Sequence, residues 1–195
     1  MARFNLESAI SFTIFTIFFS QFLISNVNGD LEDFGKRLSL KKLGLRRQKL
    51  SQFRFYFQEI VTPPTPTAVV IVRAPNSTAN TGFGTVTMID NALTIGPELN
   101  STLVGRAQGL YAAAAQNETA LFTAMNFVFV EGKYNGSTIS ILGRNPVMNA
   151  VREMPIIGGS GLFRFARGYA ELRTEMFNMA TGDATVEYTL YVMHY

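Results

Sequence analysis

The sequence predicts an all-β fold in which antiparallel strands close into a barrel, and three observations support this. The apolar stretches after residue 50 alternate with period two or form short β-branched runs, and none of them has a helical period. Glycine, asparagine and proline separate these stretches at short intervals. Several stretches are apolar on both faces, which suits a barrel with a filled or ligand-holding interior and an outer wall partly covered by another subunit.

Residues 1–29 form a separate segment. Residues 10–24 (ISFTIFTIFFSQFLI) are apolar with few interruptions, and Val27-Asn28-Gly29 offers small or modest side chains where a signal peptidase prefers them. The apolar run is too short for a comfortable membrane span, and polar residues follow it. We therefore expect a cleaved secretory signal peptide and a secreted protein.

Residues 30–50 form a basic segment with seven lysines and arginines against three acidic residues. Residues 1–50 hold eight of the chain's 17 basic and four of its 14 acidic residues, so nine basic and ten acidic residues remain beyond them. The barrel domain, residues 51–195, is thus nearly neutral. We expect residues 30–50 to be a flexible, solvated segment; contact with a cell-wall polyanion or a membrane surface is the alternative. A nucleic-acid partner is not expected.

The chain has no cysteine and a single histidine, His194. A cysteine–histidine zinc site and the nucleophile systems that rely on histidine are therefore excluded, and we expect neither a metal nor another cofactor. A secreted domain without disulfides must be held by a large core or by oligomerisation.

Four Asn-x-Ser/Thr sequons accompany the predicted secretion. They begin at Asn76, Asn100, Asn117 and Asn135, and none has proline in the middle position. We expect these asparagines to be glycosylated in solvent-exposed loops.

The first strand, residues 51–62, is the strongest signal. Phe53, Phe55, Phe57 and Glu59 share one face by the two-residue period. Glu59 therefore ends a row of three phenylalanines. A carboxyl at that place lies either in water at a mouth or partly buried with a raised pKa.

The other strands are expected at shorter apolar stretches. The run of four alanines in residues 105–115 favours a helix, but Gly105, Gly109 and the neighbouring strands favour a strand with small side chains. Residues 91–102 are expected to form a loop, residues 143–149 turns and residues 158–161 a hinge. The expected strands are 68–73, 84–90, 105–115, 121–131, 134–142, 151–157, 161–174 and 185–195.

Six ordered blocks resemble the plant dirigent proteins: FYFQEIVTPPTPTAV, FGTVTMIDNALTIGPE, LVGRAQGLYAAAAQNE, FVFVEGKYNGSTISILGRNP, VREMPIIGGSGLFRFARGYA and TGDATVEYTLYVMHY. They cover essentially all of residues 53–195. The resemblance implies an eight-stranded antiparallel β-barrel that is secreted to the apoplast, glycosylated and self-associated as a homotrimer or dimer. It also implies the binding of coniferyl alcohol-type phenoxy radicals, made by a separate laccase or peroxidase, and their stereoselective coupling in lignan biosynthesis.

The resemblance also implies site residues. The family strand usually ends in His-Asp-Ile with its aspartate facing the pocket, and Glu59, preceded by Gln58, stands there in this chain. Tyr111 and Arg152 match a pocket tyrosine and a pocket arginine, so Glu59, Tyr111 and Arg152 are the expected catalytic residues. The expected substrate contacts are Phe57, Asp90, Asn145 and Asp183. Ordinary roles remain open: barrel filling for Tyr111, an ion pair for Arg152 and a turn for Asp90.

The chemistry of such a pocket follows from its residues. An aromatic pocket with few polar groups binds flat phenols, and holding two radicals in one pose makes their coupling stereoselective. The resulting quinone methides need a proton donor and a base. Glu59 with a raised pKa suits that role, while Arg152 and Tyr111 suit phenolic or carbonyl oxygens.

Three functions therefore compete. The first is a dirigent protein for radical coupling, which has no oxidative activity of its own. The second is a dehydratase that resembles pterocarpan synthase and acts on an isoflavanol through a quinone methide. Ala113 and Asn145 favour this broader branch, because some lignan-forming members carry tyrosine and aspartate there. The third is a non-catalytic protein that binds phenolics at the cell wall.

Overall fold

The structure is a computed structural model that describes residues 35, 37–45, 47–74 and 81–195. The predicted signal peptide, residues 1–29, and the sequon at Asn76 lie outside these residues. The chain divides into two units after Leu45, and all of the strands belong to the second. No helix in the described ranges combines the length and apolar character needed to cross a membrane.

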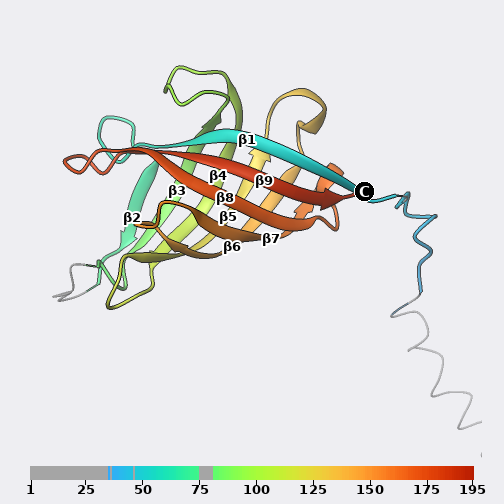
Figure 1. Cartoon of the computed structure of the whole chain (residues 1–195), viewed down its shortest axis with the longest axis horizontal. Coiled ribbons are helices and arrows are strands. Elements are labelled where there is room, and N and C mark those ends of the chain that lie inside the picture. Colours follow the sequence, from blue (N-terminus) through green and yellow to red (C-terminus); the bar gives the residue numbers. More distant parts are fainter. Residues whose placement is uncertain (1–34, 36, 46, 75–80) are drawn as a thin grey trace, which may run out of the picture. The chain divides into compact units, whose positions relative to one another are not determined.

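The second unit is built almost entirely from β-strands (Figure 1), as the sequence predicts. Two short 3₁₀ helices, η1 (Gly132–Tyr134) and η2 (Gly161–Phe163), lie in connections between strands. The strands are β1 (Lys49–Glu59), β2 (Ala68–Val72), β3 (Val86–Thr94), β4 (Leu103–Ala113), β5 (Ala120–Phe129), β6 (Thr138–Pro146), β7 (Arg152–Ser160), β8 (Arg167–Phe177) and β9 (Ala184–His194).

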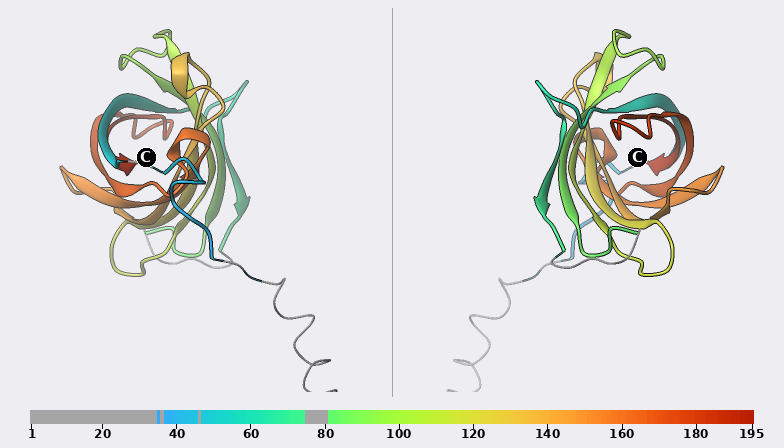
Figure 2. Two further views of the ribbon diagram at one scale, coloured as in Figure 1. Left: turned by 90° about the vertical axis from the view of Figure 1, so that its right-hand side faces the viewer. Right: turned by 90° about the vertical axis from the view of Figure 1, so that its left-hand side faces the viewer.

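The sheet closes on itself, which confirms the predicted eight-stranded antiparallel barrel. Its strand order is β1-β9-β8-β7-β6-β5-β4-β3-β2, and β1 also pairs with β3. That closing pair joins Tyr56–Gln58 to Ala92–Thr94, while β2 pairs with the preceding half of β3. Figure 2 shows the strands curving round a common axis.

The structure corrects three element boundaries. Residues 91–94 continue β3 where a loop was predicted, because closure pairs them with β1. Residues 143–146 continue β6 where turns were predicted, because they pair with the start of β5. The strand predicted at residues 161–174 begins only at Arg167, because Gly161 has a φ of +60° and opens η2.

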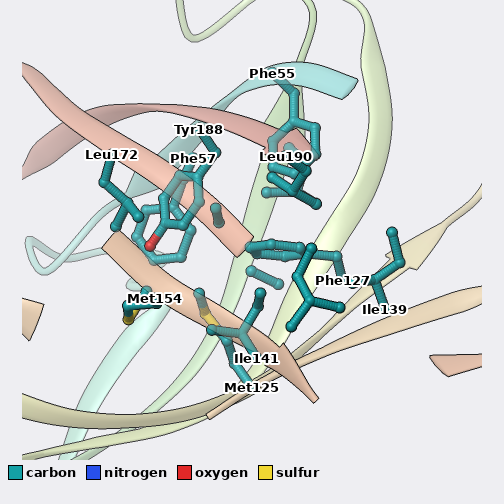
Figure 3. Packing of buried hydrophobic residues seen from close by; sticks show 14 of the residues in the cluster. Phe55, Phe57, Met125, Phe127, Ile139, Ile141, Met154, Leu172, Tyr188 and Leu190 are labelled. Atoms are coloured by element: carbon teal, nitrogen blue, oxygen red, sulfur yellow. The ribbon is translucent and has the colours of Figure 1, made fainter. Parts of the chain in front are cut away.

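Aromatic and aliphatic side chains pack together inside the barrel (Figure 3). The predicted inward row of β1 is confirmed: the Phe53 ring lies 5.5 Å from that of Phe163, and the Phe55 ring packs edge-to-face on Phe127 at 5.0 Å. Phe57 meets Tyr188 of β9 at 5.7 Å. Beyond this pair the interior opens, so the barrel is packed at one end and hollow at the other.

Candidate functional site

A cavity of about 460 Å³ occupies the hollow end of the barrel, where β1 ends and β9 begins. This volume lies in the range of small-molecule sites. Most of its wall is apolar, and a few polar side chains project from it. The lining consists of Phe57, Glu59, Val61, Ile89, Tyr111, Thr119, Leu121, Thr123, Met125, Asn145, Val147, Met148, Arg152, Thr174, Phe177, Gly182, Ala184, Val186 and Tyr188.

Glu59 and Tyr111 form the acidic group of the cavity. The Tyr111 hydroxyl donates a hydrogen bond of 2.8 Å to Oε1 of Glu59. Burial raises the pKa of the Glu59 carboxyl, the bond from Tyr111 lowers it, and the negative charge of Asp183 raises it, with a net upward shift. Burial also raises the pKa of Tyr111, which therefore stays a donor. This pair can store and deliver a proton. Of the two placements predicted for Glu59, the structure shows the partly buried one with a raised pKa.

Arg152 supplies the positive charge of the cavity from the first position of β7. Its Nη1 donates to the carbonyl oxygen of Val147 at 3.0 Å and to the Thr174 hydroxyl at 2.6 Å. Its Nε has no hydrogen-bond partner, and no carboxylate pairs with it, among the residues that the structure describes. Burial lowers the pKa of Arg152, although a guanidinium keeps its charge in proteins. Two hydrogen bonds thus fix the guanidinium of Arg152, and its Nε–H has no acceptor among the described residues.

Five of the predicted site residues meet in this cavity: Phe57, Glu59, Tyr111, Asn145 and Arg152. They come from β1, β4, β6 and β7, so they are far apart in sequence. Closure of the barrel brings them together on the inner wall.

Two predicted substrate contacts, Asp90 and Asp183, lie outside the cavity lining. Asp90 points outward from β3, where its carboxylate accepts hydrogen bonds from Arg106 at 2.5 Å and Gln108 at 3.2 Å. Asp183 instead fastens the segment after β1, because it accepts bonds from the Val61 amide at 2.8 Å and the Thr62 hydroxyl at 3.1 Å. The bond from Val61 is the main reason why the pKa of Asp183 is lowered. Both carboxylates have structural partners in place of a ligand.

Three predicted glycosylation sites lie within the described residues. Asn100, Asn117 and Asn135 are exposed and lie outside the strands, as a glycan acceptor requires. Their glycosylation stays a prediction.

Sequence reasoning missed four polar residues of the wall: Thr119, Thr123, Thr174 and Tyr188. Tyr188 carried a signal, because it alternates on the same face as Val186 and Leu190. Thr123 carried none, because only the strand register reveals that it lies directly across from Tyr111. No group of three or more histidine or acidic side chains in the described ranges is arranged to hold a metal ion.

The comparisons with known proteins agree with this geometry. The model of the family described as "Dirigent-like protein" matches residues 50–193. The chain is 55% identical to dirigent protein 7 of Arabidopsis thaliana over 164 residues, which cover 84% of this chain and 87% of the relative. It is 48% identical to pterocarpan synthase 1 of Glycyrrhiza echinata over 156 residues, which cover 78% of this chain and 82% of the relative.

A solved structure shares the architecture. The pterocarpan synthase dirigent protein GePTS1 superposes with a TM-score of 0.73 at 45% identity, over 77% of this chain and 87% of that chain.

Proposed function

The chain belongs to the dirigent family, and on this basis we propose that it is a dehydratase that closes a ring in an isoflavanol-type phenolic through a quinone methide. One observation carries the proposal: a protonatable carboxyl, Glu59, and a buried cation, Arg152, line the same apolar cavity. The pterocarpan synthase relatives support the choice of substrate class.

Glu59 acts first as an acid and then as a base. Burial raises the pKa of Glu59 and so favours its protonated form. In that form the carboxyl donates its proton to the benzylic hydroxyl, and the carbon–oxygen bond breaks to release water. As the ring phenol gives its proton to water at the mouth of the cavity, a neutral quinone methide remains. An internal hydroxyl then attacks the benzylic carbon and passes its proton to the Glu59 carboxylate. The ring phenolate regains a proton from water, so the net change is the loss of one water molecule.

Arg152 stabilises the phenolic oxygen on the aromatic ring of the substrate. Negative charge develops on this oxygen when the internal hydroxyl attacks, and a fixed guanidinium in a low-dielectric cavity stabilises it strongly. Its bonds to Val147 and Thr174 fix the guanidinium before the reaction begins. Tyr111 holds the Glu59 carboxyl in one orientation.

A second candidate is the stereoselective coupling of coniferyl alcohol-type radicals supplied by a laccase or peroxidase. The cavity volume of about 460 Å³ favours it, because two small phenolic rings fit in such a space. Both candidates use a quinone methide and the same three polar residues. A cell-wall protein that only binds phenolics is the third candidate.

The deciding experiment is chiral chromatography of two reactions. An isoflavanol is incubated with the protein and no oxidase, and coniferyl alcohol is coupled by a laccase with and without the protein. Conversion of the isoflavanol, lost in Glu59→Gln and Arg152→Ala but kept in the exposed control Glu153→Gln, is the expected result. An unconverted isoflavanol with enantiomeric excess in the coupling product assigns the second candidate. Binding without either product assigns the third.

We propose further that the barrel assembles as a homotrimer. Apolar side chains in register across β2 to β6 form a stripe on its outer wall: Val69, Met88, Leu110, Ala124 and Leu142. Val69, Met88 and Leu142 are 51%, 44% and 37% exposed, although all are apolar. A contiguous apolar strip on a sheet favours contact with another subunit.

We also propose that the protein is secreted to the apoplast and glycosylated, which residues 1–29 and the sequons support. A laccase or peroxidase partner belongs to the second candidate function.

A further inference from the structure

Two polar side chains of the cavity wall lack partners. Thr123 is 4% exposed and Asn145 is 8% exposed. The Thr123 hydroxyl oxygen and the Asn145 carboxamide oxygen have no hydrogen-bond partner in the described part of the chain. Buried polar groups in folded proteins are nearly always hydrogen-bonded, and leaving one unpaired costs free energy. These two oxygens therefore call for an explanation.

The strand register places them beside each other. Thr123 of β5 lies opposite Gly143 of β6, and Asn145 follows two residues further on the same face. Such diagonal neighbours can both contact one group. Gly143 places no side chain of its own beside Thr123, and Cδ of Pro155 lies 2.8 Å from the position that its Cβ would take.

Their place in the cavity is also defined. On one side, Thr123 is the direct cross-strand partner of Tyr111, which bonds Glu59. On the other side, Arg152 of β7 lines the same cavity. The open oxygens thus lie between the group that delivers the proton and the group that stabilises negative charge.

We propose that Thr123 and Asn145 form a specificity site that binds a free hydroxyl group of the ligand. The inference rests on the proposed function in taking the ligand to be a phenolic. It names the substrate class more closely: an aromatic compound with an unmethylated hydroxyl at the position held between Glu59 and Arg152.

The chemistry of the two side chains selects a hydroxyl group. The Asn145 carboxamide oxygen can only accept, whereas the Thr123 hydroxyl can donate or accept. A ligand hydroxyl satisfies both groups, because it donates to Asn145 and accepts from Thr123. A carboxylate or a methyl ether can accept from Thr123 but has no proton to give, so it leaves the Asn145 oxygen unpaired. Sites built to bond a hydroxyl reject analogues that lack it far more strongly than apolar sites reject an extra methyl group.

Binding of matched ligands tests the inference. Calorimetry compares coniferyl alcohol with the analogue methylated on its phenolic oxygen, and a hydroxyisoflavan with its methyl ether. The wild-type protein is expected to prefer the free hydroxyl in at least one pair by about tenfold or more. The double variant Thr123→Val/Asn145→Leu, which keeps side-chain size, should bind both members of that pair about equally. Thr123→Ser should keep the preference.

The control variant is Thr189→Val on the outer face of β9, which should leave the preference unchanged. Equal affinities in the wild type for both pairs, or a preference that survives in the double variant Thr123→Val/Asn145→Leu, would overturn the inference. The outcome is separable from the proposed function, because ligand preference is measured without turnover. A hydroxyl preference that depends on Thr123, in a protein that converts no isoflavanol, leaves this inference standing while the dehydratase proposal fails.

Discussion

Glu59 links the cavity to the stability of the barrel. Burial is the main cause of its raised pKa, and the hydrogen bond from Tyr111 opposes it. The folded protein therefore holds this proton more tightly than the unfolded chain does. Below the pKa that Glu59 has in the unfolded chain, the carboxyl is protonated in both states and costs no stability. Above its higher pKa in the folded protein, it is ionised in both states and the full cost of burying the charge applies. The free energy of unfolding therefore falls as pH rises between these two pKa values.

The first prediction concerns this slope. Glu59→Gln should remove the Glu59 contribution, so that stability declines less steeply above about pH 4, the ordinary range of a glutamate. Urea unfolding at a series of pH values measures it, with the exposed Glu153→Gln as control. Parallel curves for the wild type and Glu59→Gln would show that Glu59 has the same pKa in both states.

The second prediction concerns Tyr111 and the pH dependence of turnover. In the proposed dehydration Glu59 starts protonated, so kcat should fall as pH rises through its raised pKa. Tyr111→Phe removes the hydrogen bond that lowers this pKa, and the decline should move to higher pH. A pH–rate profile measures the shift, and Tyr191→Phe on the outer face of β9 is the control. A shift to lower pH would contradict the assigned role.

At the scale of an element, β8 depends on Gly168. This residue has a φ of +153°, and a Cβ placed there would lie 1.9 Å from the carbonyl oxygen of Tyr191 on β9. The third prediction is that Gly168→Ala lowers the free energy of unfolding by more than about 2 kcal/mol. A Cβ at Gly158 of β7 meets nothing within 4 Å, so Gly158→Ala should change little. Denaturant unfolding of both variants tests the contrast, and equal losses would refute it.

The sequence predicted the strands wherever alternation or β-branched runs dominated. The inward row of β1 and the small-residue strand β4 were placed correctly in spite of the four alanines. The wrong strand boundaries lie where pairing with a neighbouring strand outweighs the turn-like amino-acid composition. Residues 91–94 contain asparagine and threonine, and they form a strand because β1 closes the barrel against them.

The candidate site was predicted only in part, because the pairing of strands decides which side chains face the cavity. Family resemblance led to Glu59, Tyr111, Asn145 and Arg152, which line the cavity, and also to Asp90, which shares the face of Val86 and Met88 on β3. That face is the outer one, which no single strand reveals. Thr123 was missed because its neighbour Tyr111 is set by register alone.

At the scale of the whole molecule, the proposed homotrimer depends on the apolar stripe of the outer wall. The fourth prediction is that Met88→Glu, within the stripe, lowers the oligomeric state, because it places a charge on a surface that must desolvate. Leu50 is 71% exposed on β1, away from the stripe, and Leu50→Glu should leave assembly unchanged. Light scattering coupled to size-exclusion chromatography measures the mass. A monomeric wild-type protein would remove the basis of the trimer proposal.

The pairing of the first barrel strand with the last sets the order of events during synthesis. All of β1 pairs with β9, from Lys49 with His194 to Glu59 with Ala184. A contact between strands so distant in sequence carries a large loop-closure cost, and such topologies fold slowly. Until β9 emerges, β1 presents three phenylalanines on an open edge. Ring closure therefore waits until β9 has been synthesised, and a chain that lacks β9 keeps two unpaired edges, on β1 and β8, that invite aggregation.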